Sequence, residues 1–153
     1  MPVRTMWLGC GVGALGLITT VAGSFLPWLR SGTVNRDSYE VLALRGWAGL
    51  GNGYGEVIRV AWVAMTPVAV CCVLLFTFGL RRFAAWIGIL FGTITGTVAA
   101  LATVQGSDEG AMVGISLTGP AVALCGAVLA IAGAITVLTA SARAATSKPG
   151  GTP

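Results

Sequence analysis

Long apolar stretches are the dominant feature of the chain. Crossing the hydrocarbon core of a bilayer takes about 20 helical residues. Four segments are this long and nearly free of charge: Met6–Leu29, Val57–Leu80, Ala84–Val104 and Leu117–Ala140. None alternates apolar and polar residues as barrel strands do. Because a backbone in lipid must satisfy its own hydrogen bonds, the pattern predicts four transmembrane helices. The expected fold class is all-α, an integral membrane four-helix bundle with a longer extracytoplasmic loop between helices 1 and 2.

The composition supports this class. Hydrophobic residues make up 56% and charged residues 9% of the 153 residues, against roughly 45–50% and 25% in soluble domains. This length suits one domain, which we place at residues 1–140. Residues 141–153 have little to bury and are expected to form a flexible cytoplasmic tail.

Residues 11–16, with the sequence GVGALG, match the glycine spacing of a dinucleotide-binding turn, and Asp37 follows where such a fold places an acid for the ribose. That fold needs strands alternating with helices that show a polar face, whereas Met6–Leu29 contains no charged residue. With 23 glycines in the chain, the spacing also arises readily by chance. We therefore interpret these glycines as a thin part of the first helix, where a neighbour can approach closely.

The residue types exclude several classes of site. The chain has no histidine, and its four cysteines lie inside apolar segments. We expect the cysteines to pack as small apolar residues, and we expect no metal or other cofactor. The formal charge is +4, but the basic residues are dispersed and do not form the patch that nucleic-acid binding requires. The lipid bilayer is an expected partner, and nucleic acid is not.

The distribution of basic residues predicts the orientation, because arginine and lysine favour cytoplasmic loops. Basic residues precede span one, separate spans two and three, and follow span four: Arg4, Arg81, Arg82, Arg143 and Lys148. The loop Arg30–Glu56 also carries Arg30, Arg36 and Arg45, which count against this orientation, whereas the loop Gln105–Ser116 contains no basic residue. From this balance we expect a multi-pass plasma-membrane protein with both termini in the cytoplasm. The first span could also be a cleaved signal peptide, with Val21-Ala22-Gly23 as its small-residue site. Its apolar run is longer than about 7–15 residues, which favours an uncleaved span.

The first outer loop contains a helix-start signal. Asp37-Ser38-Tyr39-Glu40 resembles a capping box, in which Asp37 accepts from the amide of Glu40. A short helix could run to Arg45 and stop at Gly46, although an irregular loop is an equal alternative. Aromatic residues near this end, among them Trp28 and Trp62, are expected to anchor the protein at the lipid–water interface.

Charged and aromatic residues near the same end are candidates for an outer interaction surface. Glu56 and Arg59 are three residues apart at the start of span two, so they can form an ion pair that lowers the cost of a charge near the membrane. The candidate surface comprises Asp37, Glu40, Arg45, Trp47, Glu56, Arg59, Asp108 and Glu109.

Small residues at intervals of four predict close helix packing in spans three and four. The expected contact residues are Gly88, Gly92, Gly96 and Ala100 in span three, and Gly126, Ala130 and Ala134 in span four. This packing could occur within one copy or between copies. Pro67 cannot donate to the carbonyl of Val63 and should kink span two. Thr66 could satisfy the group that is freed.

Two parts of the first outer loop carry a family resemblance. Phe25-Leu26-Pro27-Trp28-Leu29-Arg30-Ser31-Gly32, followed by Arg36-Asp37-Ser38-Tyr39-Glu40-Val41-Leu42, resembles small four-span membrane proteins of actinobacteria and mycobacteria. The resemblance implies a plasma-membrane location and no specific site. The plan of four spans with a long first outer loop is also similar to that of claudin-like proteins, but their paired loop cysteines are absent here.

Two functions follow from these features. The first is a non-enzymatic membrane protein that acts as scaffold, assembly or regulatory partner of a cell-envelope complex, with a membrane or envelope protein or a second copy as partner. The alternative is a subunit of an oligomeric channel or small-solute facilitator. No ionisable side chain lies at the centre of a span, which disfavours ion pumps and proton-coupled transporters. None of the five acids has an obvious catalytic companion, and no hydroxyl has a histidine to activate it, which disfavours an enzyme.

Overall fold

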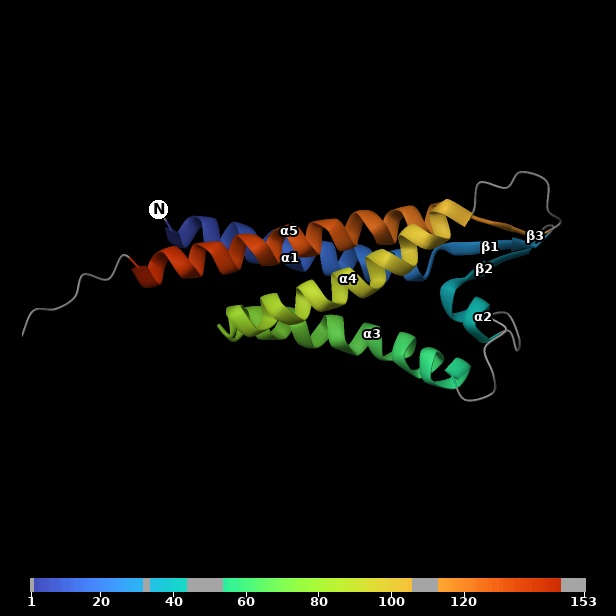
Figure 1. Ribbon diagram of the computed structural model, residues 1–153, viewed down its shortest axis with the longest axis horizontal. Helices are drawn as coiled ribbons and strands as arrows, with labels where there is room; N and C mark the ends of the chain where they lie inside the picture. Colours follow the sequence, from blue (N-terminus) through green and yellow to red (C-terminus); the bar gives the residue numbers. More distant parts are fainter. Residues whose placement is uncertain (1, 32–33, 44–53, 106–112, 147–153) are drawn as a thin grey trace, which may run out of the picture.

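The computed structural model describes residues 2–31, 34–43, 54–105 and 113–146, and it is mostly helical (Figure 1). The elements follow in the order α1 (Pro2–Ser24), β1 (Pro27–Ser31), β2 (Val34–Asp37), α2 (Ser38–Ala43), α3 (Tyr54–Thr77), α4 (Arg81–Gln105), β3 (Val113–Ile115) and α5 (Thr118–Thr146).

The four predicted spans are confirmed as helices. Within the described residues, four helical segments are long and apolar enough to cross a membrane: Arg4–Ser24, Val60–Thr77, Arg81–Val104 and Thr118–Ala144. This arrangement fits a multi-pass membrane protein. Helices α3 and α4 are joined by a tight turn at Gly79, whose φ of 85° is a backbone conformation that glycine adopts without strain.

The observed span boundaries differ from the predicted ones by a few residues, most at the ends of α1 and α5. Helix α1 ends at Ser24 and not at Leu29, because Pro27 disfavours a helical residue before it and Leu29 pairs in a strand. Helix α5 continues to Thr146, so the predicted tail begins too early. The alanine-rich sequence after Ser141 favours continuation of the helix. Residues 147–153 lie outside the described part.

The mostly helical class is confirmed, but the prediction does not include the small antiparallel sheet of order β2-β1-β3 that the structure contains. The central strand β1 pairs with β2, with Arg30 opposite Asn35, and with β3, with Arg30 opposite Gly114. The Ser116 amide extends this link by donating to the Trp28 carbonyl at 2.9 Å. The sheet therefore joins the segment after α1 to the segment before α5.

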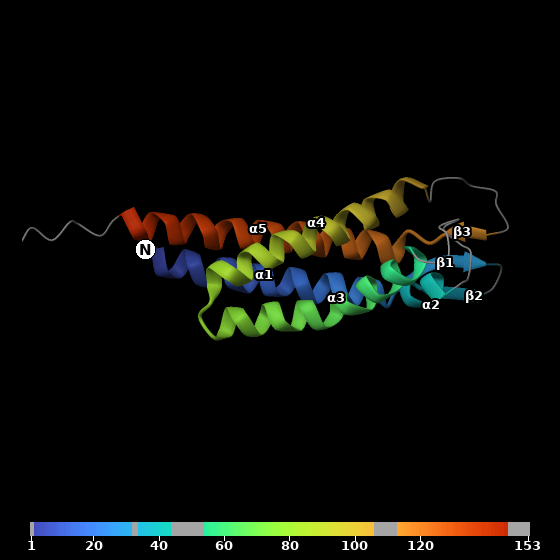
Figure 2. The ribbon, with the colours of Figure 1, turned by 60° about the horizontal axis from the view of Figure 1, so that its bottom comes forward.

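The two ends of the molecule differ. The sheet and α2 lie at one end, which we call the sheet end. The N-terminus of α1, the α3–α4 turn and the C-terminus of α5 lie toward the other (Figures 1 and 2). We call this the arginine end, because Arg4, Arg81, Arg82 and Arg143 lie there.

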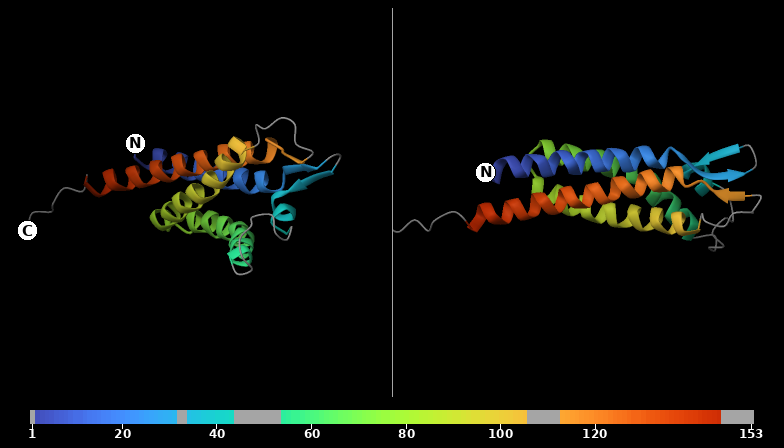
Figure 3. Two further views of the ribbon diagram at one scale, coloured as in Figure 1. Left: turned by 45° about the vertical axis from the view of Figure 1, so that its right-hand side comes forward. Right: turned by 90° about the horizontal axis from the view of Figure 1, so that it is seen from above.

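Helices α1 and α5 run side by side along the length of the molecule (Figure 3). Their glycines lie in register at intervals of seven: Gly9, Gly16 and Gly23 on α1, and Gly119, Gly126 and Gly133 on α5. A Cβ atom at Gly16 would lie 2.7 Å from the Gly126 carbonyl oxygen, and one at Gly126 would lie 2.8 Å from the Gly16 carbonyl oxygen. The two backbones thus touch, as small residues in membrane helices allow.

This contact accounts for part of the glycine spacing of residues 11–16. Gly16 faces the backbone of α5, and Gly13 faces Gly133 and the ring of Phe76. Gly11 has open space around it. The interpretation of the motif as a place where a helix approaches closely is confirmed for Gly13 and Gly16.

The small residues of α4 and α5 divide between two contacts. On α4, Gly92 faces the Ala127 carbonyl and Ile131, and Gly96 faces the Ala127 side chain. On α5, however, Gly126 and Ala130 face α1 around Gly16. The prediction that the stripe containing Gly126 packs on span three is therefore wrong for these two residues. Ala134 is the member that meets α4, with its methyl 3.9 Å from a Cβ placed at Gly88.

Helix α3 packs mainly through larger side chains, which join those of α1, α4 and α5 in a core. Phe76 of α3 and Phe91 of α4 are buried in it. The Cys72 thiol, also buried, donates to the Ala84 carbonyl across the α3–α4 turn at 3.1 Å. All four cysteines are free, and Cys10 and Cys72 pack in the core as predicted.

Candidate functional site

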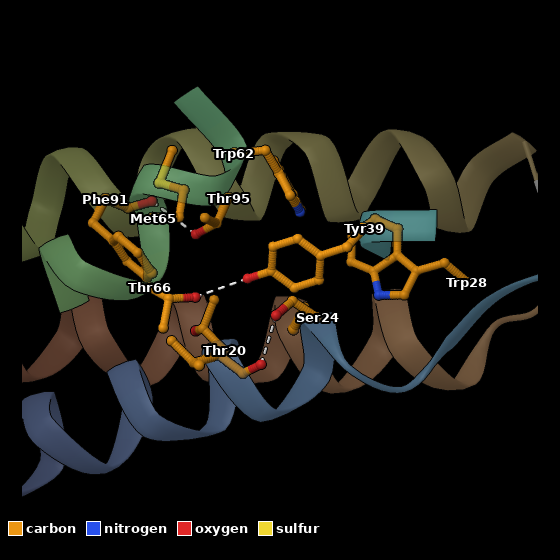
Figure 4. Close-up of a pocket in the computed structure, with 11 residues that line it drawn as sticks. Thr20, Ser24, Trp28, Tyr39, Trp62, Met65, Thr66, Phe91 and Thr95 are labelled. Atoms are coloured by element: carbon orange, nitrogen blue, oxygen red, sulfur yellow. Dashed lines mark hydrogen bonds between the residues drawn. The ribbon is translucent and has the colours of Figure 1, made fainter. Parts of the chain in front are cut away.

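A group of polar side chains lies at the sheet end, where α2 is bonded to α1 and α3; Figure 4 shows the pocket that several of them line. We call this group the hydroxyl cluster, formed by Thr20, Ser24, Ser38, Tyr39, Thr66 and Thr95 together with Trp28 and Trp62.

The local sequence places α2 over the helices. Asp37 accepts a hydrogen bond from the Glu40 amide at 2.8 Å through its side-chain oxygen, which caps the helix N-terminus. The prediction of a helix start at Asp37 is thus confirmed, and the helix is described to Ala43. Its predicted end at Arg45 and Gly46 lies outside the described residues. Asp37 is therefore a capping residue at the end of β2, and the Glu40 side chain is exposed.

Ser38 joins three elements. Its hydroxyl, on α2, donates to the Ser24 carbonyl at the end of α1 at 2.6 Å. The same oxygen accepts from the indole nitrogen of Trp62 on α3 at 3.1 Å. Ser38 is only 3% exposed, so these bonds form away from solvent. The carbonyl left without a helical partner where α1 ends is therefore satisfied by the loop that follows.

Tyr39 reaches further into the bundle. Its ring packs on Phe25 at a centroid distance of 5.2 Å, and its hydroxyl lies 2.8 Å from the Thr66 hydroxyl on α3 (Figure 4). Thr66 precedes Pro67, which lies inside α3. The Thr66 hydroxyl, which we expect to satisfy the carbonyl freed by Pro67, thus bonds to Tyr39 of α2. This bond attaches the sheet end to α3 at the proline.

Trp28 and Trp62 are buried, at 8% and 9% exposure. Their rings meet edge to face at a centroid distance of 5.7 Å, and the Trp28 indole donates to the Gly23 carbonyl at 2.9 Å. The prediction that they anchor the protein in the lipid interface is therefore wrong. Gly119 makes room for Trp28, because a Cβ there would lie 2.6 Å from the indole nitrogen.

A cavity of about 20 Å³ lies within the cluster, which is the space of about one water molecule. Its hydroxyls already donate elsewhere: Thr20 to Gly16, Ser24 to Val21 and Thr95 to Phe91, at 2.9, 2.7 and 2.7 Å. Among the described residues, no group of three His, Cys, Asp or Glu could hold a metal ion. The arrangement can order one water and fix α2. It offers no described base to activate a hydroxyl.

The predicted outer surface is only partly described. Asp37 and Glu40 lie together at the start of α2, beside the sheet. Arg45, Trp47, Asp108 and Glu109 lie outside the described residues. Glu56 and Arg59 belong to the first turns of α3 by their backbone, and their side chains are outside the described part. The predicted Glu56–Arg59 pair stays a prediction.

Sequence reasoning missed Ser38, Trp62 and Thr95 as parts of one cluster. The available signal was that hydroxyl residues interrupt several apolar spans, and such groups in lipid need partners. Comparison of the chain with protein-family models, curated proteins and solved structures found no match.

Proposed function

We propose that this is a non-enzymatic, multi-pass plasma-membrane protein that acts as scaffold, assembly or regulatory partner of a cell-envelope complex through its sheet end. The termini are cytoplasmic in this proposal, and the sheet end faces the opposite side. The basic residues at the arginine end support this orientation, because they favour the cytoplasmic side of a membrane.

The proposal rests on one observation: the segments at the sheet end are held together by strand pairing and by hydrogen bonds to the helices. The sheet joins the two connections at this end, and α2 is bonded to α1 through Ser38 and to α3 through Ser38 and Tyr39. Within the described residues, β1 is central, so β2 and β3 each pair on one side only. Edge strands of this kind can pair with an extended segment of another chain.

The channel alternative draws less support from a single copy. The described interior contains a cavity with room for about one water, and its hydroxyls are bonded within the protein. A conducting path would have to form between copies. We therefore give priority to the interaction function.

Site-specific photocrosslinking in native membranes tests the proposal. A photoreactive amino acid is placed at Val34 or at Asn35, which are exposed on β2. Successive side chains of a strand point to opposite faces, so the two positions sample both faces of the sheet. The control position is Val128, which is exposed on α5. We expect one distinct protein to be attached at the β2 positions and absent at Val128. Adducts with lipid only, at all three positions, would contradict the proposal.

A further inference from the structure

An apolar groove of about 250 Å³ runs between α1 and α3. Helix α3 is the span least covered by the rest of the protein, so the groove opens on the surface that faces lipid in a membrane. Its lining is entirely aliphatic, formed by Leu17, Ile18 and Val21 of α1 and by Ala69, Val70, Val73 and Leu74 of α3.

Arg81 lies where the same two helices meet the arginine end. Its side chain crosses from the start of α4 to α1, with the guanidinium carbon 4.4 Å from the centre of the Trp7 ring. One terminal nitrogen donates to the Met6 sulfur at 3.5 Å. Its Nε is buried and has no hydrogen-bond partner among the described residues. The guanidinium is thus held in place by an aromatic ring and a thioether, neither of which neutralises its charge.

The sequence supplies no acidic side chain near this arginine. The five acids are Asp37, Glu40, Glu56, Asp108 and Glu109, which fall in or beside the connections at the sheet end. Two further exposed arginines, Arg4 and Arg82, flank Arg81 at the arginine end. No acidic side chain is therefore placed to pair with this group, and the phosphates of membrane lipids are anions that lie at that depth.

The groove and the arginine are aligned. Trp7, Ile18 and Val21 are separated by nearly whole helical turns, about three between Trp7 and Ile18, so they share one side of α1. The rise from Trp7 to Ile18 is about 16 Å at 1.5 Å per residue. One leaflet of the hydrocarbon core is about 15 Å deep, half of about 30 Å. The phosphate lies about 5 Å outside this core, so a lipid with its phosphate at Arg81 would place the end of an acyl chain near Val21, which also lines the groove.

We propose that the protein binds one anionic phospholipid at this place. The headgroup phosphate accepts hydrogen bonds from the Arg81 guanidinium, with Arg4 and Arg82 adding positive charge. One acyl chain fills the groove between α1 and α3. This inference does not depend on the function proposed for the sheet end.

Native mass spectrometry of the full-length protein in mild detergent tests the proposal. The protein is titrated with dioleoyl phosphatidylglycerol and, separately, with dioleoyl phosphatidylcholine, and dissociation constants are compared. We expect the anionic lipid to bind the wild type roughly fivefold more tightly, as one interfacial arginine provides. Equal affinities in the wild type would overturn the proposal without any variant.

Two pairs of variants separate the headgroup from the chain. Arg81→Gln should remove the preference for phosphatidylglycerol, whereas Arg36→Gln, which makes the same change of charge in β2, should keep it.

Val70→Trp fills the groove and should weaken the binding of both lipids severalfold. Val63→Trp is its control, because Val63 is equally exposed on α3, at 56% against 54%, and does not line the groove. Equal loss of preference in both arginine variants would indicate net-charge attraction only and would overturn the site. Unchanged binding by Val70→Trp would overturn the groove as the place of the acyl chain.

Discussion

The α1–α5 pair and helix α3 are attached to the bundle in different ways. Helices α1 and α5 meet backbone to backbone through glycines at intervals of seven. Helix α3 is held by side chains, through the Phe76 core near one end and the bonds to Ser38 and Tyr39 near the other. In the α1 and α5 spans 39% of the residues are buried within the protein, compared with 22% in α3.

The difference shows how a membrane protein can combine a tightly packed pair of helices, here α1 and α5, with a helix that is held by fewer contacts, here α3. Lipid removes the hydrophobic advantage of helix association, so close van der Waals packing and hydrogen bonds decide which helices stay together. Backbone contact tolerates no added atom, whereas a side-chain contact can be lost one bond at a time. We therefore expect substitutions in the α1–α5 contact to affect the whole fold and substitutions on α3 to act locally.

The largest effect is expected for Gly16→Ala. The added methyl would meet the backbone of Ala130 and Gly126, which cannot move without separating the helices. Overpacking typically costs about 1–3 kcal/mol of unfolding free energy, and we expect the upper end of this range because the contact is with backbone atoms. Thermal unfolding followed by circular dichroism in detergent measures it. The control is Gly11→Ala, five residues earlier and in open space, which should stabilise the helix by up to about 1 kcal/mol. Equal melting temperatures of the two variants would contradict backbone contact.

Ser38→Ala should have the next largest effect. The change leaves the Trp62 indole N–H and the Ser24 carbonyl without their buried partner, which costs about 1–3 kcal/mol. Tryptophan fluorescence during chemical denaturation measures this loss of unfolding free energy. Ser24→Ala is the matched control, because that hydroxyl bonds only within its own helix, to Val21, and its loss should cost well below about 1 kcal/mol. A reversed order of the two variants would argue against Ser38 as the link between α2, α1 and α3.

Tyr39→Phe should produce a smaller, local effect. It removes the bond to Thr66 and keeps the ring against Phe25, at a cost of about 1 kcal/mol. Hydrogen exchange should increase in α3 around Pro67 and stay unchanged in α1 and α5. A double-mutant cycle with Thr66→Val should give a coupling of about 0.6 kcal/mol, and additive effects would show that the bond does not hold α3.

Gly88→Ala should have the smallest effect. A Cβ at Gly88 would make ordinary contacts, at 3.8 Å to the Cys72 sulfur and 3.9 Å to Ala134, so stability should rise by up to about 1 kcal/mol through helix propensity. Gly92→Ala, one turn later, should destabilise, because its Cβ would lie 3.1 Å from the Ala127 carbonyl and 2.8 Å from Ile131. Thermal unfolding ranks the two. If both variants gain stability, α4 is less tightly packed on α5 than the structure indicates.

The sequence predicts the membrane-crossing helices well, because length and hydropathy act over some twenty residues and neighbours change them little. It does not predict the sheet. The strands contain 5, 4 and 3 residues, too few for an alternating pattern to emerge. The pairing of Leu29 with Ile115 also joins residues far apart in the chain, which local pattern cannot indicate.

The sequence also does not indicate which helices pack against each other. Gly126 and Ala130 form a small-residue stripe that could meet any neighbour, and only the three-dimensional arrangement turns it toward Gly16. At the hydroxyl cluster, the sequence predicts the Asp37 cap because its hydrogen bond joins residues only three positions apart. The Trp62–Ser38 and Tyr39–Thr66 bonds span 24 and 27 residues, so no local signal marks them.

The α1–α5 contact also has a consequence for biogenesis. Among the four described spans, the one synthesised first, α1, has its closest partner in the one synthesised last, α5, and β1 can pair with β3 only after α4 has been made. During synthesis the glycine face of α1 therefore remains without its partner until α5 has been inserted. Contacts of such long sequence separation form late, so nascent α1 needs temporary cover from lipid or from the insertion machinery. Premature termination before α5 should leave the product open to degradation.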